Sequence, residues 1–128
     1  MPNANVLIVD DNPVNARLAS ITLEMAGYAV QIASDADEAM LLLDGELPDL
    51  VLMDVQLPGM DGLELTRHLR GGPATAGLRI VAMTSYAMRG DAERTIDAGC
   101  DGYIAKPIDT RTFAGVVASY LPATAGRE

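Results

Sequence analysis

The sequence lacks several features that would place this 128-residue chain in a membrane or secreted class. Cys100 is the only cysteine, so no disulfide can form within the chain, and a reducing compartment, the cytoplasm, is expected. The uncharged segment 1–5 precedes an apolar run that is too short for the core of a signal peptide. No apolar stretch approaches the roughly 18 residues that a membrane-spanning helix needs. We therefore expect no membrane contact.

Basic side chains are also scarce. The chain has 9 Lys and Arg residues against 18 Asp and Glu residues, which gives a net charge of −9. This charge opposes the phosphate backbone of nucleic acids and the headgroups of anionic lipids. We therefore expect no direct binding to nucleic acid.

What the sequence does contain is apolar material for one compact core, at 49% hydrophobic residues. Residues 1–121 are expected to form a single domain, and residues 122–128, which lack periodicity, a flexible tail. Short apolar runs predict interior strands, and a less pure run predicts an edge strand. The interior runs are 6–9, 50–53, 80–83 and 102–105, and the edge run is 28–33.

Helical patterns separate these runs. Asn12 is the predicted cap of the first helix, with Pro13 at its first position, and Asp35 with Glu38 predicts a capping box at the second. The predicted helices cover about residues 13–26, 36–44, 63–70, 88–98 and 113–121. Their predicted inward faces are Val14, Leu18, Ile21 and Met25; Ala36, Ala39, Met40 and Leu43; Leu65 and Leu69; Ala92 and Ile96; and Phe113, Val116, Val117, Tyr120 and Leu121.

Five strands that alternate with five helices are typical of parallel βαβ units with right-handed crossovers. The predicted fold is therefore α/β: a flavodoxin-like, doubly wound (βα)5 sandwich with a parallel sheet of order 2-1-3-4-5. In such sheets ligands bind beyond the carboxyl ends of the strands.

Acidic residues stand at two of these strand ends. Asp10 and Asp11 follow the first run, and Asp54 follows the third, with a turn predicted at Pro58-Gly59. If the two strands are neighbours, these acids converge, and two carboxylates about 4 Å apart repel by about 4 kcal/mol at an effective dielectric near 20. A divalent cation would relieve this repulsion, and all-oxygen ligands favour Mg²⁺.

The two remaining strand ends on that side carry an alcohol and an amine. Thr84 offers a hydroxyl and Lys106 an ammonium group. With a metal ion, these groups could surround the three oxygens of a phosphoryl group, and Asp54 could accept it as an acyl phosphate. Taken singly, Asp10 is explained as a helix cap and Lys106 as a surface lysine. Their joint occurrence at successive strand ends favours phosphoryl chemistry.

The whole pattern resembles the response-regulator receiver domain of two-component signalling. The residues that carry the resemblance, in order and with the family's spacing, are Asp10-Asp11, Met53-Asp54 with the segment 57–62, Thr84, and the segment 102–107.

The resemblance implies a role for each matching residue. Asp54 would be the phosphoacceptor, phosphorylated by a histidine kinase or a histidine phosphotransfer protein. Asp11, Asp54 and the backbone carbonyl of Gln56 would bind Mg²⁺ directly, and Asp10 through a water. Lys106 would contact the phosphoryl oxygens, and its bond to Pro107 would be cis.

The resemblance also implies a switch. Thr84 would be drawn toward the phosphoryl group and Tyr103 would turn inward, which shifts the population between two existing arrangements. The face of the last two helices and the last strand would then bind a downstream protein. Gln56 and Tyr86 occupy positions that tune the phosphoryl lifetime in the family.

Three other functions are alternatives to a receiver domain. A Mg²⁺-dependent phosphatase or phosphotransferase for small molecules often has a second aspartate two positions after its nucleophile, where this chain has Gln56. A flavodoxin relative would need a Gly-rich or Ser/Thr-rich loop after the first strand, in place of the segment 10–13. A scaffold without phosphorylation would not need the full set of matching residues. We therefore expect a signalling switch and not an enzyme acting on other substrates.

Overall fold

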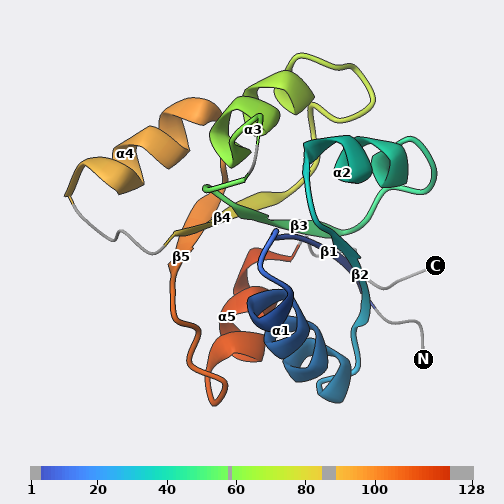
Figure 1. Cartoon of the computed structure of the whole chain (residues 1–128), viewed down its shortest axis with the longest axis vertical. Helices are drawn as coiled ribbons and strands as arrows, with labels where there is room; N and C mark the ends of the chain where they lie inside the picture. The colour runs from blue at the N-terminus through green and yellow to red at the C-terminus, as the bar shows by residue number, and fades with distance from the viewer. Residues whose placement is uncertain (1–3, 58, 85–88, 122–128) are drawn as a thin grey trace.

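Five parallel strands form one sheet at the centre of the molecule (Figure 1). The computed structural model describes residues 4–57, 59–84 and 89–121. The sheet has the order β2-β1-β3-β4-β5, which confirms the predicted fold and strand order. The strands are β1 (Asn5–Val9), β2 (Ala29–Ala33), β3 (Leu50–Asp54), β4 (Ile80–Thr84) and β5 (Gly102–Ala105).

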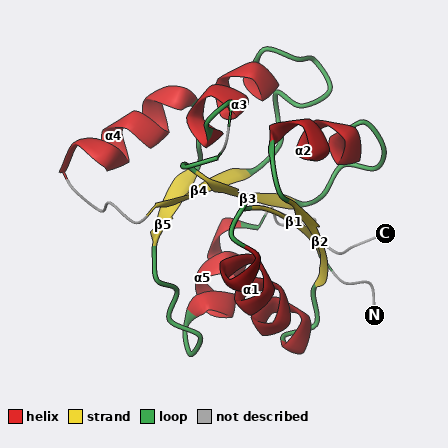
Figure 2. Ribbon diagram, in the orientation of Figure 1, coloured by secondary structure: helices red, strands yellow, loops and turns green. Residues whose placement is uncertain are grey.

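Helices cover both faces of the sheet (Figure 2). α1 and α5 lie on one face, and α2, α3 and α4 lie on the other. The helices are α1 (Pro13–Met25), α2 (Ala36–Leu43), α3 (Gly62–Arg70), α4 (Arg89–Ala98) and α5 (Phe113–Tyr120). Within the described parts of the chain, no helix combines the length and the apolar character needed to cross a membrane.

The sheet is buried most deeply at its centre. Every residue of β3 and β4 is buried, because helices pack on both faces of these strands. β2 lies at the edge and is largely exposed, as its mixed sequence predicts. Alternate residues of β1 enter different cores: Leu7 and Val9 pack under α2 and α3, while Val6 and Ile8 pack under α1 and α5.

The predicted helix caps are present. The side-chain oxygen of Asn12 accepts hydrogen bonds from the backbone N–H groups of Val14 and Asn15, with Pro13 at the first helical position. Asp35 accepts from the N–H of Glu38 at 2.8 Å. The returning bond of the predicted capping box differs, because the Glu38 carboxylate accepts from the N–H of Ser34 and not of Asp35.

The predicted inward face of α1 is wrong. Val14 and Met25 are 74% and 83% exposed, and Leu18 and Ile21 are also exposed. The buried residues of α1 are instead Ala16, Ala19 and Leu23. The two small alanines let the helix lie close to the sheet, whereas a pattern built on large residues follows a different side of the helix.

The faces of α4 and α5 also differ in part from the prediction. Ile96 is 55% exposed, and Thr95 and Ala98 take the buried positions of α4. On α5, Phe113 and Val117 are buried as predicted, with Tyr120 and Leu121 packed beside them, but Val116 is exposed. The other predicted inward residues are buried or packed against a core: Ala36, Ala39, Met40, Leu43, Leu65 and Leu69.

Some predictions fall on residues outside the described ranges. They are Pro58 of the predicted turn, Tyr86, the predicted helix start at Met88, the side chain of Ala92 and the predicted tail 122–128.

The packing of α1 gives a direct test. Leu23→Ala is expected to lower the free energy of unfolding by about 2–5 kcal/mol, since it empties a buried site. Met25→Ala, two positions along the same helix, is expected to change it by less than about 0.5 kcal/mol. Urea unfolding followed by circular dichroism measures both. Equal losses would contradict the observed orientation of α1.

Candidate functional site

Three carboxylates converge at the carboxyl ends of β1 and β3. Val9 lies opposite Met53 in the parallel register, so the next residues, Asp10 and Asp54, come side by side. One oxygen from each of Asp10, Asp11 and Asp54 lies within 4.8 Å of the others. Asp10 and Asp54 are buried, while Asp11 is exposed. The convergence expected from the sequence is therefore present in the structure.

Backbone N–H groups fix the two buried carboxylates. Asp10 accepts a hydrogen bond from the N–H of Asn12 at 2.9 Å, and its own N–H donates to Ala33 on β2 at 3.0 Å. Asp54 accepts from the N–H of Gln56 at 3.0 Å. One oxygen of each carboxylate is thus held by the loop that follows its strand.

The second oxygens of the two buried carboxylates meet Lys106. Its Nζ atom lies 3.1 Å from Oδ2 of Asp10 and 3.1 Å from Oδ2 of Asp54. The backbone N–H of Lys106 donates to the carbonyl oxygen of Thr84 at 2.8 Å, which ties the end of β5 to the end of β4. The Lys106–Pro107 peptide bond is cis, as the resemblance implied. The lysine therefore spans the sheet from β5 to β1.

The charges of the site are out of balance. The Lys106 ammonium pairs with two members of a cluster of three carboxylates, and its single positive charge balances one of the three negative charges. Burial raises the pKa of Asp54 above its ordinary value and the Asp10 charge acts in the same direction, whereas the Gln56 N–H and Lys106 oppose the rise. An all-oxygen cluster with excess negative charge and one exposed member fits a hard divalent cation such as Mg²⁺.

The other predicted site residues lie around this cluster. Thr84 is buried at the end of β4, opposite Ala105 in register. Thr84 and the exposed Gln56 line one cavity of about 430 Å³, together with Asp61. Tyr103 lies on β5 and is 38% exposed. Thr84 and Gln56 thus lie at the carboxyl ends of the strands, as Asp54 does. Tyr103 lies near the start of β5.

Gly62 belongs to the segment 57–62 that carries the family resemblance, but its contact with the site was not predicted. Gly62 begins α3, with Asp61 as the cap, and its N–H donates to Val55 at 3.0 Å. A Cβ atom added at Gly62 would overlap the carbonyl oxygen of Asp54. The absence of a side chain here lets α3 pack directly against the end of β3. A glycine at the end of a post-strand loop is a weak signal of such a contact, because turns use glycine too.

A second cavity lies beside Lys106. It has a volume of about 370 Å³, and its lining includes Asp10, Lys106 and Pro107 from the site and Asn15 and Leu18 from α1. The exposed side of α1 is therefore continuous with the surface around the carboxylates.

Comparison with protein families agrees with this geometry. The family model for the response regulator receiver domain matches residues 6–118. The chain belongs to the response regulator receiver domain family. This receiver domain is 40% identical over 121 residues to the polar-differentiation response regulator DivK of Brucella anthropi, across 94% of this chain and 98% of the relative.

Solved structures show the same fold. A putative response regulator from Chloroflexus aurantiacus matches with a TM-score of 0.87 at 32% identity, covering 92% of this chain and 97% of that one. The chemotaxis response regulator CheY4 of Vibrio cholerae matches with a TM-score of 0.87 at 28% identity, covering 93% and 99%. The chain is therefore a receiver domain of two-component signalling, a class of signalling switches and not of classical enzymes.

The close approach at Gly62 can be tested by adding one methyl group. Gly62→Ala is expected to lower the free energy of unfolding by about 1–3 kcal/mol, because the methyl group meets rigid backbone. Gly115→Ala is the matched control, since a Cβ at that position of α5 meets nothing within 4 Å. It is expected to raise stability by about 0.5–1 kcal/mol. A stable Gly62→Ala variant would contradict the tight packing.

The raised pKa of Asp54 predicts that its ionisation lowers the stability of the folded chain, by an amount that depends on pH. Ionisation of Asp54 is less favourable in the folded chain than in the unfolded chain. The cost is absent below the ordinary pKa of an aspartate and complete above the raised pKa of Asp54. In EDTA, Asp54→Asn is therefore expected to raise the thermal unfolding midpoint at pH 7, and this gain should shrink as the pH falls toward 4. Calorimetry across this range would refute the idea if the wild-type chain were the more stable at pH 7.

Proposed function

We propose that this receiver domain accepts a phosphoryl group on Asp54 from a phosphohistidine of a histidine kinase or phosphotransfer protein, and thereby changes its protein contacts. The observation that carries the proposal is the position of the Asp54 carboxylate, which pairs with the Lys106 ammonium and lies within 4.8 Å of oxygens of Asp10 and Asp11. This arrangement supports a nucleophile that is paired with a fixed cation and belongs to a cluster able to bind a metal ion.

The proposed transfer needs little movement from the chain. An oxygen of Asp54 would attack phosphorus, the P–N bond to the donor imidazole would break, and its electron pair would return to the imidazole nitrogen. The Lys106 ammonium would bind the oxygens of the transferred phosphoryl group, since it already contacts the Asp54 carboxylate. The N–H of Gln56 would hold the carboxylate in position during the attack.

A bound Mg²⁺ would neutralise charge on the phosphoryl oxygens. Its proposed ligands are the carboxylates of Asp11 and Asp54 and the backbone carbonyl of Gln56, with Asp10 acting through a water. The exposure of Asp11 and the ion pair of the buried Asp10 with Lys106 support this division of roles.

The proposed switch uses Thr84 and Tyr103. Thr84 would turn its hydroxyl toward the phosphoryl group, and the partly exposed Tyr103 would move inward. The effector would bind the face formed by α4, β5 and α5. Slow hydrolysis would return the domain to its starting state, so phosphotransfer and dephosphorylation are its own reactions and not turnover of other substrates.

The proposed phosphodonor meets the domain beside α1. Val14, Leu18, Ile21 and Met25 expose apolar surface along this helix, and Leu18 also lines the cavity that contains Lys106. An exposed apolar stripe beside polar reacting groups suits a transient protein contact.

The domain itself is proposed to span residues 1–121, with residues 122–128 as a flexible tail. The single cysteine supports the cytoplasm as its proposed location.

Phosphorylation in solution tests the proposal. Incubation with acetyl phosphate and Mg²⁺ is expected to add one acid-stable, base-labile phosphoryl group to the wild-type chain and none to Asp54→Asn, as measured by intact mass spectrometry. Asp37→Asn, on the exposed side of α2, should be labelled normally. EDTA should reduce labelling strongly, because the carboxylates then repel the incoming phosphoryl oxygens. Lys106→Ala should weaken the conformational response.

Two results would contradict this proposal. Labelling of Asp54→Asn equal to that of the wild-type chain would assign the phosphoryl group to another residue. Multiple turnover of small phosphate esters would favour the alternative of a small-molecule phosphatase.

A further inference from the structure

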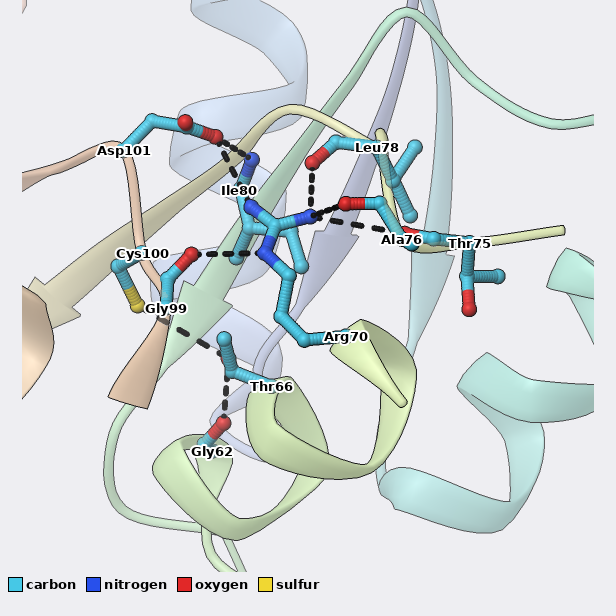
Figure 3. A network of polar contacts seen from close by, with 10 residues as sticks. All are labelled: Gly62, Thr66, Arg70, Thr75, Ala76, Leu78, Ile80, Gly99, Cys100 and Asp101. Atoms are coloured by element: carbon cyan, nitrogen blue, oxygen red, sulfur yellow. Dashed lines mark hydrogen bonds and ion pairs between the residues drawn. The ribbon is translucent and has the colours of Figure 1, made fainter. Parts of the chain in front are cut away.

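The guanidinium group of Arg70 joins three segments at the end of the sheet opposite to Asp54 (Figure 3). Arg70 is the last residue of α3. Its Nη1 atom donates to the carbonyl oxygens of Ala76, at 3.1 Å, and of Leu78 in the loop before β4. Its Nε atom donates to the carbonyl oxygen of Gly99 at 2.8 Å, and its Nη2 atom pairs with Asp101 at 3.1 Å. A planar fork of five donors is suited to such a junction.

Gly99 connects this junction to α4. It follows the last residue of α4 with a φ of +107°, and its N–H and that of Cys100 bond back to Ile96 and Thr95. Arg70 caps the same helix end by binding the Gly99 carbonyl. A Cβ atom at Gly99 would lie 2.8 Å from Cγ of Arg70, so the glycine also makes room for the arginine stem.

Asp101 connects the junction to the sheet. The carboxylate oxygen that pairs with Arg70 also accepts the N–H of Ile80, the first residue of β4, at 2.8 Å. The N–H of Asp101 donates to the carbonyl oxygen of Ile80 at 2.7 Å. The segment after α4 is thus bound to both α3 and β4. Charge-assisted hydrogen bonds of this kind are stronger than neutral ones.

The middle of α4 borders the proposed phosphorylation site. Arg94 and Thr95 line the cavity that also contains Thr84 and Gln56. Thr84 and Ile80 stand at opposite ends of β4, so the Arg70 junction and the site are about 13 Å apart along the strand. The helix α4 therefore shares a cavity with Thr84 and Gln56, and Arg70 binds the segment at its C-terminal end.

We propose that Arg70 is a positioning residue that anchors the C-terminal end of α4, so that occupation of the Asp54 site moves only the N-terminal part of this helix. The inference rests on the proposed function, because it concerns the response to a phosphoryl group. A helix held at one end responds by pivoting about that end, while a helix held at neither end shifts as a whole. The anchor at Arg70 would thereby determine which part of the α4 surface changes position and becomes available to a partner protein.

Amide hydrogen exchange with and without beryllofluoride and Mg²⁺ tests the anchor. In the wild-type chain, beryllofluoride is expected to change exchange at residues 54–56 and 89–94 and to leave the amides of Gly99, Cys100 and Ile80 unchanged. In Arg70→Ala, these three amides should exchange about tenfold faster without beryllofluoride, and they should now respond to it. If Arg70 had a purely structural role, the three amides would exchange faster in Arg70→Ala but would not respond to beryllofluoride.

Two further variants complete the experiment. Arg67→Ala, which removes an exposed arginine from the same helix, should behave as the wild-type chain. Asp101→Asn is a milder variant, since it keeps an oxygen for the Ile80 N–H but removes the charge opposite Arg70, and it should shift the same amides in the same direction. It decides the question if Arg70→Ala does not fold.

The outcomes separate the anchor from the proposed function. An absence of any beryllofluoride effect at residues 54–56 would contradict the proposed function and the inference with it. A change at residues 54–56 with equal changes at both ends of wild-type α4 would overturn the anchor alone. So would a beryllofluoride response in Arg70→Ala or Asp101→Asn that matches the wild-type response.

Discussion

The ion pairs of Lys106 with Asp10 and Asp54 are the interactions on which the site depends. They require β1 and β3 to be neighbours, so that two acids from distant parts of the sequence lie side by side. They also require β5 to end beside β4, where the Thr84 carbonyl receives the Lys106 N–H. The strand order therefore creates the site, because a different order would leave these charges buried without partners.

The fold was predictable because its sheet is covered on both faces. Central strands such as β3 and β4 are then apolar at every position except the last, which is a clear signal in sequence. The acids at the strand ends were predictable for a related reason: Asp54 ends an apolar run of four residues, so a charge there stands out. Predicting that they meet needed the rule that parallel strands end at the same edge, together with a strand order that makes β1 and β3 neighbours.

The helix faces and the supporting residues were harder to predict. On α1 the buried side carries Ala16 and Ala19, and a small residue has little weight in a hydrophobic pattern even where close packing requires it. The contacts of Gly62 and Arg70 could not be predicted, since a glycine in a turn and an arginine at a helix end are common. Their importance depends on backbone atoms that the fold brings near: the Asp54 carbonyl for Gly62 and the Gly99 carbonyl for Arg70.

The edge strand β2 affects how the protein behaves in concentrated solution. β2 has the sequence Ala-Val-Gln-Ile-Ala, which contains neither a charge nor a proline, two features that keep edge strands from pairing with another chain. The net charge of −9 opposes such pairing by mutual repulsion between molecules. Salt screens this repulsion, so high ionic strength is expected to favour contact between β2 and another chain.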